Sequence, residues 1–252
     1  MAERVTFIID GKKVEADHNE NLLTVAKRNN IHIPNLCYHP SIESYGSCRL
    51  CLVEVVRRGW GKITAACTYP AQEGIEVFTD NERVLKNRRM MMELLLARCP
   101  DNPQIKKIGA EMGVTETRFP KEDSDCILCG LCVRICHDII KVGAINFAQR
   151  GKKRVITTPF EKPAEFCITC QACAHVCPTG AIKFQEEGGT RKAVNWGAVQ
   201  ERMECPRCHE YFEPRIMIDQ VKDLVKLPEE IFHLCDQCRR REFGYKLVAL
   251  RP

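Results

Sequence analysis

Two cysteine runs of the same spacing constrain the fold of this chain more than any other feature. In such a run the first three thiolates bind one iron–sulfur cluster, and the fourth usually ligates the other cluster. The pattern therefore predicts two [4Fe-4S] clusters. The first would be held by Cys126, Cys129, Cys132 and Cys177, and the second by Cys136, Cys167, Cys170 and Cys173. Disulfides or paired zinc sites are the alternatives, and the repetition of the same four-cysteine spacing disfavours both.

A second group of cysteines lies in the N-terminal eighty residues. Residues 5–9 and 12–15 flank Asp10-Gly11, which is typical of a hairpin with a two-residue turn. Residues 21–30 have the apolar spacing of a short amphipathic helix, and residues 52–56 and 74–79 have strand character. We therefore expect a β-grasp ferredoxin domain holding one [2Fe-2S] cluster through Cys37, Cys48, Cys51 and Cys67.

Two alternatives for this N-terminal site remain open. A zinc knuckle would use the same thiols but would leave the upstream hairpin and helix unexplained. His39 lies close to Cys37 and could enter a mixed site, although four cysteines already satisfy two irons. The first gap of ten residues departs from the four-residue gap of plant-type ferredoxins. It also disfavours the iron–sulfur subunit of fumarate-reductase-like enzymes, which uses the short gap.

The C-terminal quarter carries two further cysteine pairs. They have the form of knuckles, 26 residues apart, and consist of Cys205, Cys208, Cys235 and Cys238. Two such knuckles make a tetrahedral four-cysteine site of zinc-ribbon character, so we expect a structural zinc ion. A further iron–sulfur cluster bound by the same thiols is the alternative. Cys99 is the one cysteine of 17 that no predicted site uses, and we expect a free thiol in a packed loop.

Composition restricts the setting of the protein. The start of the chain has no features of an export signal, and no apolar run approaches the ~18 residues of a membrane span. Reduced thiols and iron–sulfur ligands favour a cytoplasmic location. The net charge of +5 comes without an aromatic-rich basic strand or recognition helix, so nucleic-acid binding is not expected. Basic groups such as residues 150–154 fit a solvated face or a docking site for an acidic electron carrier.

Several segments resemble one known family. The N-terminal part of the large iron–sulfur subunit of complex I is similar, and so is the matching region of NADH-linked, electron-bifurcating [FeFe]-hydrogenases. The resemblance runs from about residue 1 to about residue 187. It rests on Pro34–Pro40, Gly46–Glu54, Ala66–Thr68, Arg150-Gly151, Thr158–Phe160 and Cys177–Ala181.

The family pattern breaks after an expected amphipathic helix over residues 81–98. In the family this helix leads to a His and three Cys that bind another four-iron cluster. The corresponding stretch, Ala97–Pro103, has one Cys and no His, so we predict that this cluster is absent.

These features together predict an α+β protein of four modules. Residues 1–80 form the [2Fe-2S] domain, 81–119 a helical connector, 120–190 a bacterial-ferredoxin-like domain with two [4Fe-4S] clusters, and 191–252 a zinc-ribbon-like module. We find no Gly-rich phosphate loop, no Ser/His/Asp set and no paired carboxylates in an apolar pocket. No catalytic residue is therefore predicted.

The resemblance implies an electron-transfer subunit within a hetero-oligomer. Its partners would be an NAD(P)H-binding flavoprotein subunit with FMN and iron–sulfur clusters, and a ferredoxin or second catalytic subunit. Flavin-based electron bifurcation is one setting for such a complex. The alternatives are a stand-alone polyferredoxin or redox-responsive binding protein, and the iron–sulfur subunit of a fumarate-reductase-like enzyme.

Overall fold

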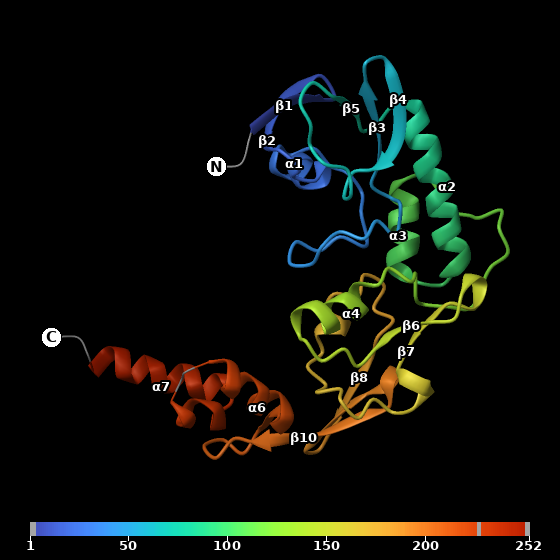
Figure 1. The fold of residues 1–252 in the computed structure, drawn as a ribbon. Helices are drawn as coiled ribbons and strands as arrows, with labels where there is room; N and C mark the ends of the chain where they lie inside the picture. Colours follow the sequence, from blue (N-terminus) through green and yellow to red (C-terminus); the bar gives the residue numbers. More distant parts are fainter. Residues whose placement is uncertain (1–3, 226–227, 250–252) are drawn as a thin grey trace. The chain divides into compact units, whose positions relative to one another are not determined.

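The computed structural model describes residues 4–225 and 228–249, and the chain divides into two compact units (Figure 1). The first unit runs to Leu131 and also takes in the short segment Cys177–Ala181. The second takes in Cys132–Val176 and the chain from Ile182 onward. Helices and strands are mixed in both units, as predicted for an α+β protein.

The first unit is built on a five-stranded sheet of order β2-β1-β5-β3-β4. Strands β1 and β5 pair in parallel, whereas the other neighbouring strands pair antiparallel. The predicted hairpin, helix and returning strands are all present. The elements are β1 (Arg4–Ile9), β2 (Lys12–Asp17), α1 (Leu22–Arg28), β3 (Leu52–Arg57), β4 (Trp60–Ala65), β5 (Glu76–Phe78), α2 (Glu82–Arg98) and α3 (Pro103–Glu111).

The hairpin turn is fixed by residues that tolerate positive φ. Asp10 has φ 49° and Gly11 has φ 78°, the left-handed pair that a tight two-residue turn requires. The Asp10 carboxylate also accepts hydrogen bonds from the backbone N–H of Thr79, at 2.7 Å, and from its hydroxyl, at 2.6 Å. The first turn of the chain is thereby joined to the end of β5.

An asparagine begins each of the three helices of this unit. Asn21 caps α1 by accepting from the Thr24 N–H at 2.9 Å, and Asn81 caps α2 by accepting from the Val84 N–H at 2.9 Å. Asn102 caps α3, where Pro103 occupies the first turn. Each cap satisfies a backbone donor that the helix itself leaves unpaired, which stabilises the helix start by about 1 kcal/mol.

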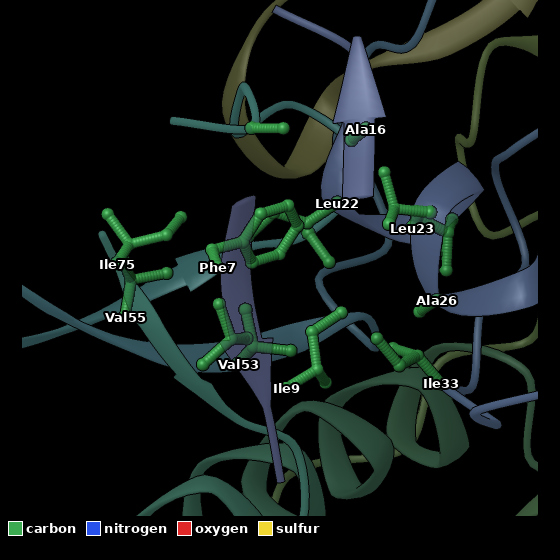
Figure 2. Packing of buried hydrophobic residues seen from close by; sticks show 14 of the residues in the cluster. Phe7, Ile9, Ala16, Leu22, Leu23, Ala26, Ile33, Val53, Val55 and Ile75 are labelled. Atoms are coloured by element: carbon green, nitrogen blue, oxygen red, sulfur yellow. The ribbon is translucent and has the colours of Figure 1, made fainter. Parts of the chain in front are cut away.

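One hydrophobic core unites the sheet with α1. Phe7 and Ile9 of β1 pack with Leu22 and Leu23 of α1 and with Val53 of β3 (Figure 2). All five side chains are at most 2% exposed. Burying a side chain of this size stabilises the fold by roughly 1.5–3 kcal/mol. The core of this unit therefore does not depend on a metal alone.

The second unit contains a four-stranded sheet of order β11-β10-β9-β8 and a two-stranded sheet of β6 and β7. A π-helical turn, η1, directly follows α4. The elements are α4 (Leu131–Arg134, whose first residue closes the first unit), η1 (Ile135–Ile139), β6 (Asn146–Ala148), η2 (Gly151–Lys153), β7 (Val155–Thr157), η3 (Pro159–Glu161), α5 (Ala172–His175), β8 (Phe184–Glu187), β9 (Thr190–Ala193), η4 (Val194–Trp196), β10 (Ala198–Glu204), β11 (Tyr211–Pro214), α6 (Arg215–Leu224), η5 (Glu229–His233) and α7 (Asp236–Ala249).

An ion-pair network centred on a buried arginine crosses the four-stranded sheet. Arg191 of β9 is 4% exposed and pairs with Glu186 of β8 and Glu213 of β11, each at 2.6 Å. Arg202 of β10 also pairs with Glu186, at 3.0 Å. The pairing makes the buried charge of Arg191 tolerable. Because the paired residues lie on β8, β9, β10 and β11, the network also links all four strands.

Among the helices within residues 4–225 and 228–249, none combines the length and the apolar character that crossing a lipid bilayer requires.

Candidate metal centres

The four N-terminal cysteines come together beside the five-stranded sheet. Cys37 follows α1, Cys48 and Cys51 precede β3, and Cys67 follows β4. All four are at most 5% exposed. The Cys48 N–H donates to the Cys37 sulfur at 3.3 Å. The structure thus gathers the predicted [2Fe-2S] set in one buried place within the first unit.

Hydrogen bonds among these four thiols give them different pKa values. Contacts with the Cys48 and Cys67 thiols lower the pKa of Cys37 to about 2, against the effect of burial. A contact with the Cys67 thiol lowers the pKa of Cys51 to about 7. The same contacts, together with burial, raise the pKa values of Cys48 and Cys67. Thiols that share protons in this way are suited to bind a metal cation, which would replace the protons between the sulfurs.

Helix α2 supplies a buried cation next to this site. Arg88 is 5% exposed, and its Nε donates to the carbonyl of Leu52, the residue after Cys51, at 2.8 Å. Burial lowers the pKa of Arg88, while the Cys51 thiolate acts in the opposite direction. Its Nη2 has no hydrogen-bond partner among the residues that the structure describes. The sequence placed Arg88 in a basic group, residues 86–89, expected to form a solvated face or a docking site, and for Arg88 its burial in the structure makes this wrong.

Three of the four cysteines predicted for the first [4Fe-4S] cluster lie in the first unit. Burial raises the pKa of Cys126 and raises that of Cys129 to about 11, and the nearby Cys177 thiolate adds to both shifts. The loop turns tightly at Leu128, which has φ 53° and donates its N–H to the Cys126 sulfur at 3.4 Å. Cys132 is the first residue of the second unit, so its place in this set stays a prediction.

The N-terminal site and this first cubane loop are in contact. The Ser47 hydroxyl donates to the carbonyl of Leu128 at 3.1 Å, although the two residues are 81 positions apart. The Cys37 thiolate is also near enough to contribute to the raised pKa of Cys129. Both residues of each pair belong to the first unit. Two predicted redox centres therefore share one direct hydrogen bond between their loops.

The second predicted cubane set lies entirely in the second unit. Cys136 from η1, Cys173 from α5, and Cys167 and Cys170 from the loop before α5 line one small cavity. Burial raises the pKa of Cys173 to about 12, and the Trp196 side chain acts in the opposite direction. The four thiols line the cavity together, and they lie near enough for the charge of one to raise the pKa of another. This arrangement fits a shared cluster.

The C-terminal cysteines form the tightest group. The sulfurs of Cys205, Cys208, Cys235 and Cys238 all lie within 4.8 Å of one another. The Cys208 and Cys235 sulfurs are 3.6 Å apart. Burial opposes ionisation of Cys205, but the N–H groups of Cys235, Arg207 and Cys208 lower its pKa to about 6. His209 instead contacts Glu204, at 2.8 Å between Nδ1 and Oε1.

Cys99 stands apart from these groups. It is fully buried at the C-terminus of α2, and its N–H donates to the Leu95 carbonyl at 2.9 Å. Burial raises the pKa of Cys99 to about 12. A thiol in such surroundings is inert at neutral pH, which fits a packing role.

Comparison with protein-family models matches both redox regions of the chain. Residues 2–82 match the model described as a 2Fe-2S iron-sulfur cluster binding domain. Residues 125–181 match the model described as a 4Fe-4S dicluster domain. The predicted domain types are therefore confirmed, while the ligand of each individual iron stays a prediction.

Curated relatives identify the kind of protein that carries these domains. NADPH-Fe(3+) oxidoreductase subunit alpha of Geobacter sulfurreducens is 27% identical over 97% of this chain. The NADH-ubiquinone oxidoreductase 78 kDa subunit of Candida albicans is 28% identical over 71%, and NADP-reducing hydrogenase subunit HndD of Solidesulfovibrio fructosivorans 28% over 72%. The chain is homologous to iron–sulfur subunits of NAD(P)-linked oxidoreductases. It spans 31%, 28% and 36% of the length of these three relatives, respectively.

A solved structure supports the same homology. A chain of an NAD+-reducing [NiFe]-hydrogenase in the H2-reduced state matches with a TM-score of 0.63 and 27% identity. The match covers 73% of this chain and 88% of the hydrogenase chain. The resemblance predicted from the motifs is thus confirmed both in sequence and in three dimensions.

Proposed function

We propose that this chain carries single electrons between an NAD(P)H-oxidising flavoprotein subunit and a second redox partner. The observation that carries the proposal is the hydrogen bond from Ser47 to Leu128, which joins the two-iron loop to the first cubane loop. Bound clusters would supply the one-electron chemistry. The chain's own residues would hold them by thiolate ligation, bury them and keep neighbouring centres in contact.

The proposed ligand sets follow the spacing rule. Cys37, Cys48, Cys51 and Cys67 would hold a [2Fe-2S] cluster. Cys132 would complete the first [4Fe-4S] set with Cys126, Cys129 and Cys177, and Cys136 would join Cys167, Cys170 and Cys173 in the second.

For the terminal site we propose zinc. With Zn–S bonds of about 2.3 Å, a tetrahedron of sulfurs has edges of about 3.8 Å. The Cys208–Cys235 separation of 3.6 Å is close to that edge. A cubane places one thiolate on each of four irons, which spaces the sulfurs more widely. Zinc is redox-inert, so this site would organise the C-terminal module and stay outside the electron path.

The proposed partners come from the relatives, whose names describe subunits of NADPH-, NADH- and NADP-linked oxidoreductases. We propose a cytoplasmic hetero-oligomer with an FMN-containing flavoprotein, and a ferredoxin or second catalytic subunit as the other partner. Electron bifurcation would be a property of that complex, because it needs a flavin that this chain's thiolate sites do not bind.

Metal analysis and reduction assays test the proposal. Anaerobically purified protein should contain about 10 irons and about one zinc per chain. About 14 irons without zinc would instead assign the terminal site to a third cubane. With its flavoprotein partner, NADH or NADPH should bleach the cluster absorbance. Oxidised clusters under those conditions, or a chain that purifies without partners, would contradict the proposal and favour a stand-alone polyferredoxin.

A further inference from the structure

A tryptophan outside the dicluster segment forms part of the second cluster cavity. Trp196 lies in η4, beyond the matched residues 125–181, and lines the same cavity as the four cysteines of the second set. It is 7% exposed, and its indole nitrogen is buried without a hydrogen-bond partner among the residues that the structure describes. An indole N–H can only donate, so an acceptor is expected where it points.

The position of Trp196 is fixed from both sides. Its carbonyl accepts from the Ala164 N–H at 3.0 Å, which ties η4 to the loop that leads to Cys167. Gly197 follows with φ 64°, and a side chain there would come within 3.4 Å of Pro163. The backbone therefore holds the indole against the cavity wall.

The cysteine sulfurs of the second set are the acceptors that the surroundings offer, because they line the same cavity as the indole. Thiolate sulfurs of clusters accept N–H hydrogen bonds, and such bonds change cluster potential. A donor without another partner in the interior gains most from this contact.

Two other polar side chains near this cavity are less suited to the role. The Thr169 hydroxyl is fully buried and without a described partner, but it could turn toward several atoms. Arg191 donates to the Thr169 carbonyl at 3.3 Å, yet its charge is balanced by Glu186 and Glu213. The indole N–H of Trp196, in contrast, is uncharged, and the rigid ring fixes the direction in which it donates.

We infer that Trp196 donates an N–H···S hydrogen bond to a cysteine sulfur of this cavity and thereby raises the reduction potential of the second [4Fe-4S] cluster. The inference rests on the proposed function, because it requires a cluster at this site. Reduction adds one electron and breaks no bond. The added negative charge on the sulfurs strengthens the hydrogen bond, so the contact favours the reduced state. The second cluster would then hold an electron more readily than it would without this contact.

Replacement by phenylalanine tests this contact, because Trp196→Phe keeps an aromatic ring and removes the N–H donor together with part of the indole ring system. In a dithionite titration followed by EPR, one [4Fe-4S] centre should become harder to reduce. At fixed solution potential its ratio of reduced to oxidised forms should fall roughly three- to tenfold, equivalent to about 30–60 mV. The matched control is Trp60→Phe, since Trp60 is the other tryptophan and is 85% exposed. Unchanged potentials in Trp196→Phe would overturn the inference.

A second measurement does not depend on the variant's folding. In the Trp60→Phe chain, ¹⁵N-indole labelling places the label on Trp196 alone. Pulsed EPR of the reduced protein should show ¹⁵N coupling and an exchangeable proton coupling at one [4Fe-4S] centre. Absence of both couplings would refute the hydrogen bond. A protein that shows no [4Fe-4S] signal at all would refute the proposed function, whereas normal signals without coupling would refute this inference only.

Discussion

At the scale of single residues, the predicted ligand thiols differ from Cys99 in what faces their sulfur. The Cys126 sulfur accepts the Leu128 N–H, and the Cys205 sulfur accepts the Cys235 N–H at 3.5 Å. Such donors favour the thiolate, which is the form that binds metal. Burial raises the pKa of Cys99, as it does for Cys126 and Cys129, so burial alone does not distinguish it. The backbone N–H groups that donate to the Cys126 and Cys205 sulfurs are the feature that fits ligand cysteines.

Cys99→Ala should keep the full iron content, because no cluster depends on this sulfur. The loss of a small buried group should lower the free energy of unfolding by about 1 kcal/mol. Iron analysis and denaturant unfolding measure both quantities. The matched variant Cys129→Ala should lose roughly four irons, the content of one cubane. Iron loss from Cys99→Ala would mean that Cys99 is a ligand.

Ser47→Ala should slow electron transfer from the two-iron centre to the first [4Fe-4S] cluster. It removes the hydroxyl that bonds Leu128, a contact of about 1 kcal/mol, so the loops should separate slightly. We expect a roughly two- to tenfold lower rate in flash-reduction experiments. Ser44→Ala, in the same loop, is the control and should keep the original rate. Equal rates in both variants would exclude this contact from the electron path.

At the scale of elements, α2 combines two tasks. Its apolar residues Val84, Met92 and Leu96 are at most 4% exposed and anchor the helix. Arg88, one turn after Val84, carries a buried positive charge to the backbone beside Cys51. A helix that sequence analysis described only as a connector therefore also supports the two-iron site.

Arg88→Met should make the two-iron centre harder to reduce. Removing a buried positive charge near Cys51 destabilises the added electron, and we expect a shift on the order of 50 mV to more negative potential. The Leu52 carbonyl would lose its donor, at a cost of about 1–3 kcal/mol in stability. EPR redox titration measures the potential. Arg89→Met changes an exposed neighbour and should leave it unaltered.

The sequence predicted the elements of the first unit well, because their patterns are local. Asp10-Gly11, the apolar spacing of residues 21–30 and the strand character of residues 52–56 each specify structure within a few positions. Strand β4 was missed, since Trp60, Gly61 and Lys62 are exposed and show no buried face. The sheet β8–β11 was also missed. Its strands are rich in exposed charged residues, and the burial of Arg191 depends on its pairing with Glu186 and Glu213 on other strands.

The candidate sites were predictable to the extent that spacing specifies ligands. Cys205, Cys208, Cys235 and Cys238 were grouped from sequence, and the structure brings them together. Trp196 and Arg88 were not predicted as site residues, because each reaches its site through tertiary packing and neither belongs to a motif. A lone tryptophan or arginine in the sequence carries no information about which sulfur it will face.

At the scale of the whole molecule, the two units differ in what stabilises them. The first has an extensive hydrophobic core around Phe7 and Val53. Around the terminal cysteines the core is small and centres on Met203, Ile218 and Phe232. A small core of this kind depends on metal binding for much of its folding energy.

Removing the terminal metal should therefore unfold the C-terminal module and spare the five-stranded sheet. After treatment with a zinc chelator, hydrogen exchange in β11 and α6 should accelerate at least tenfold, while amides of β1 and β3 keep their protection. Mass spectrometry of peptides from both regions measures this. Parallel loss of protection in both regions would show that the module and the sheet unfold together.

The division of the chain has a consequence for how such a protein can be dissected. The main chain passes from one unit to the other after Leu131, returns for Cys177–Ala181, and then leaves again. Asn102 fastens the returning stretch by donating to the Thr179 carbonyl at 2.8 Å. A gene fragment that stops short of Cys177 would encode a first unit without its closing peptide. Neither unit is a contiguous stretch of the chain, so exchanging either unit as a whole would require two separate gene segments to be joined.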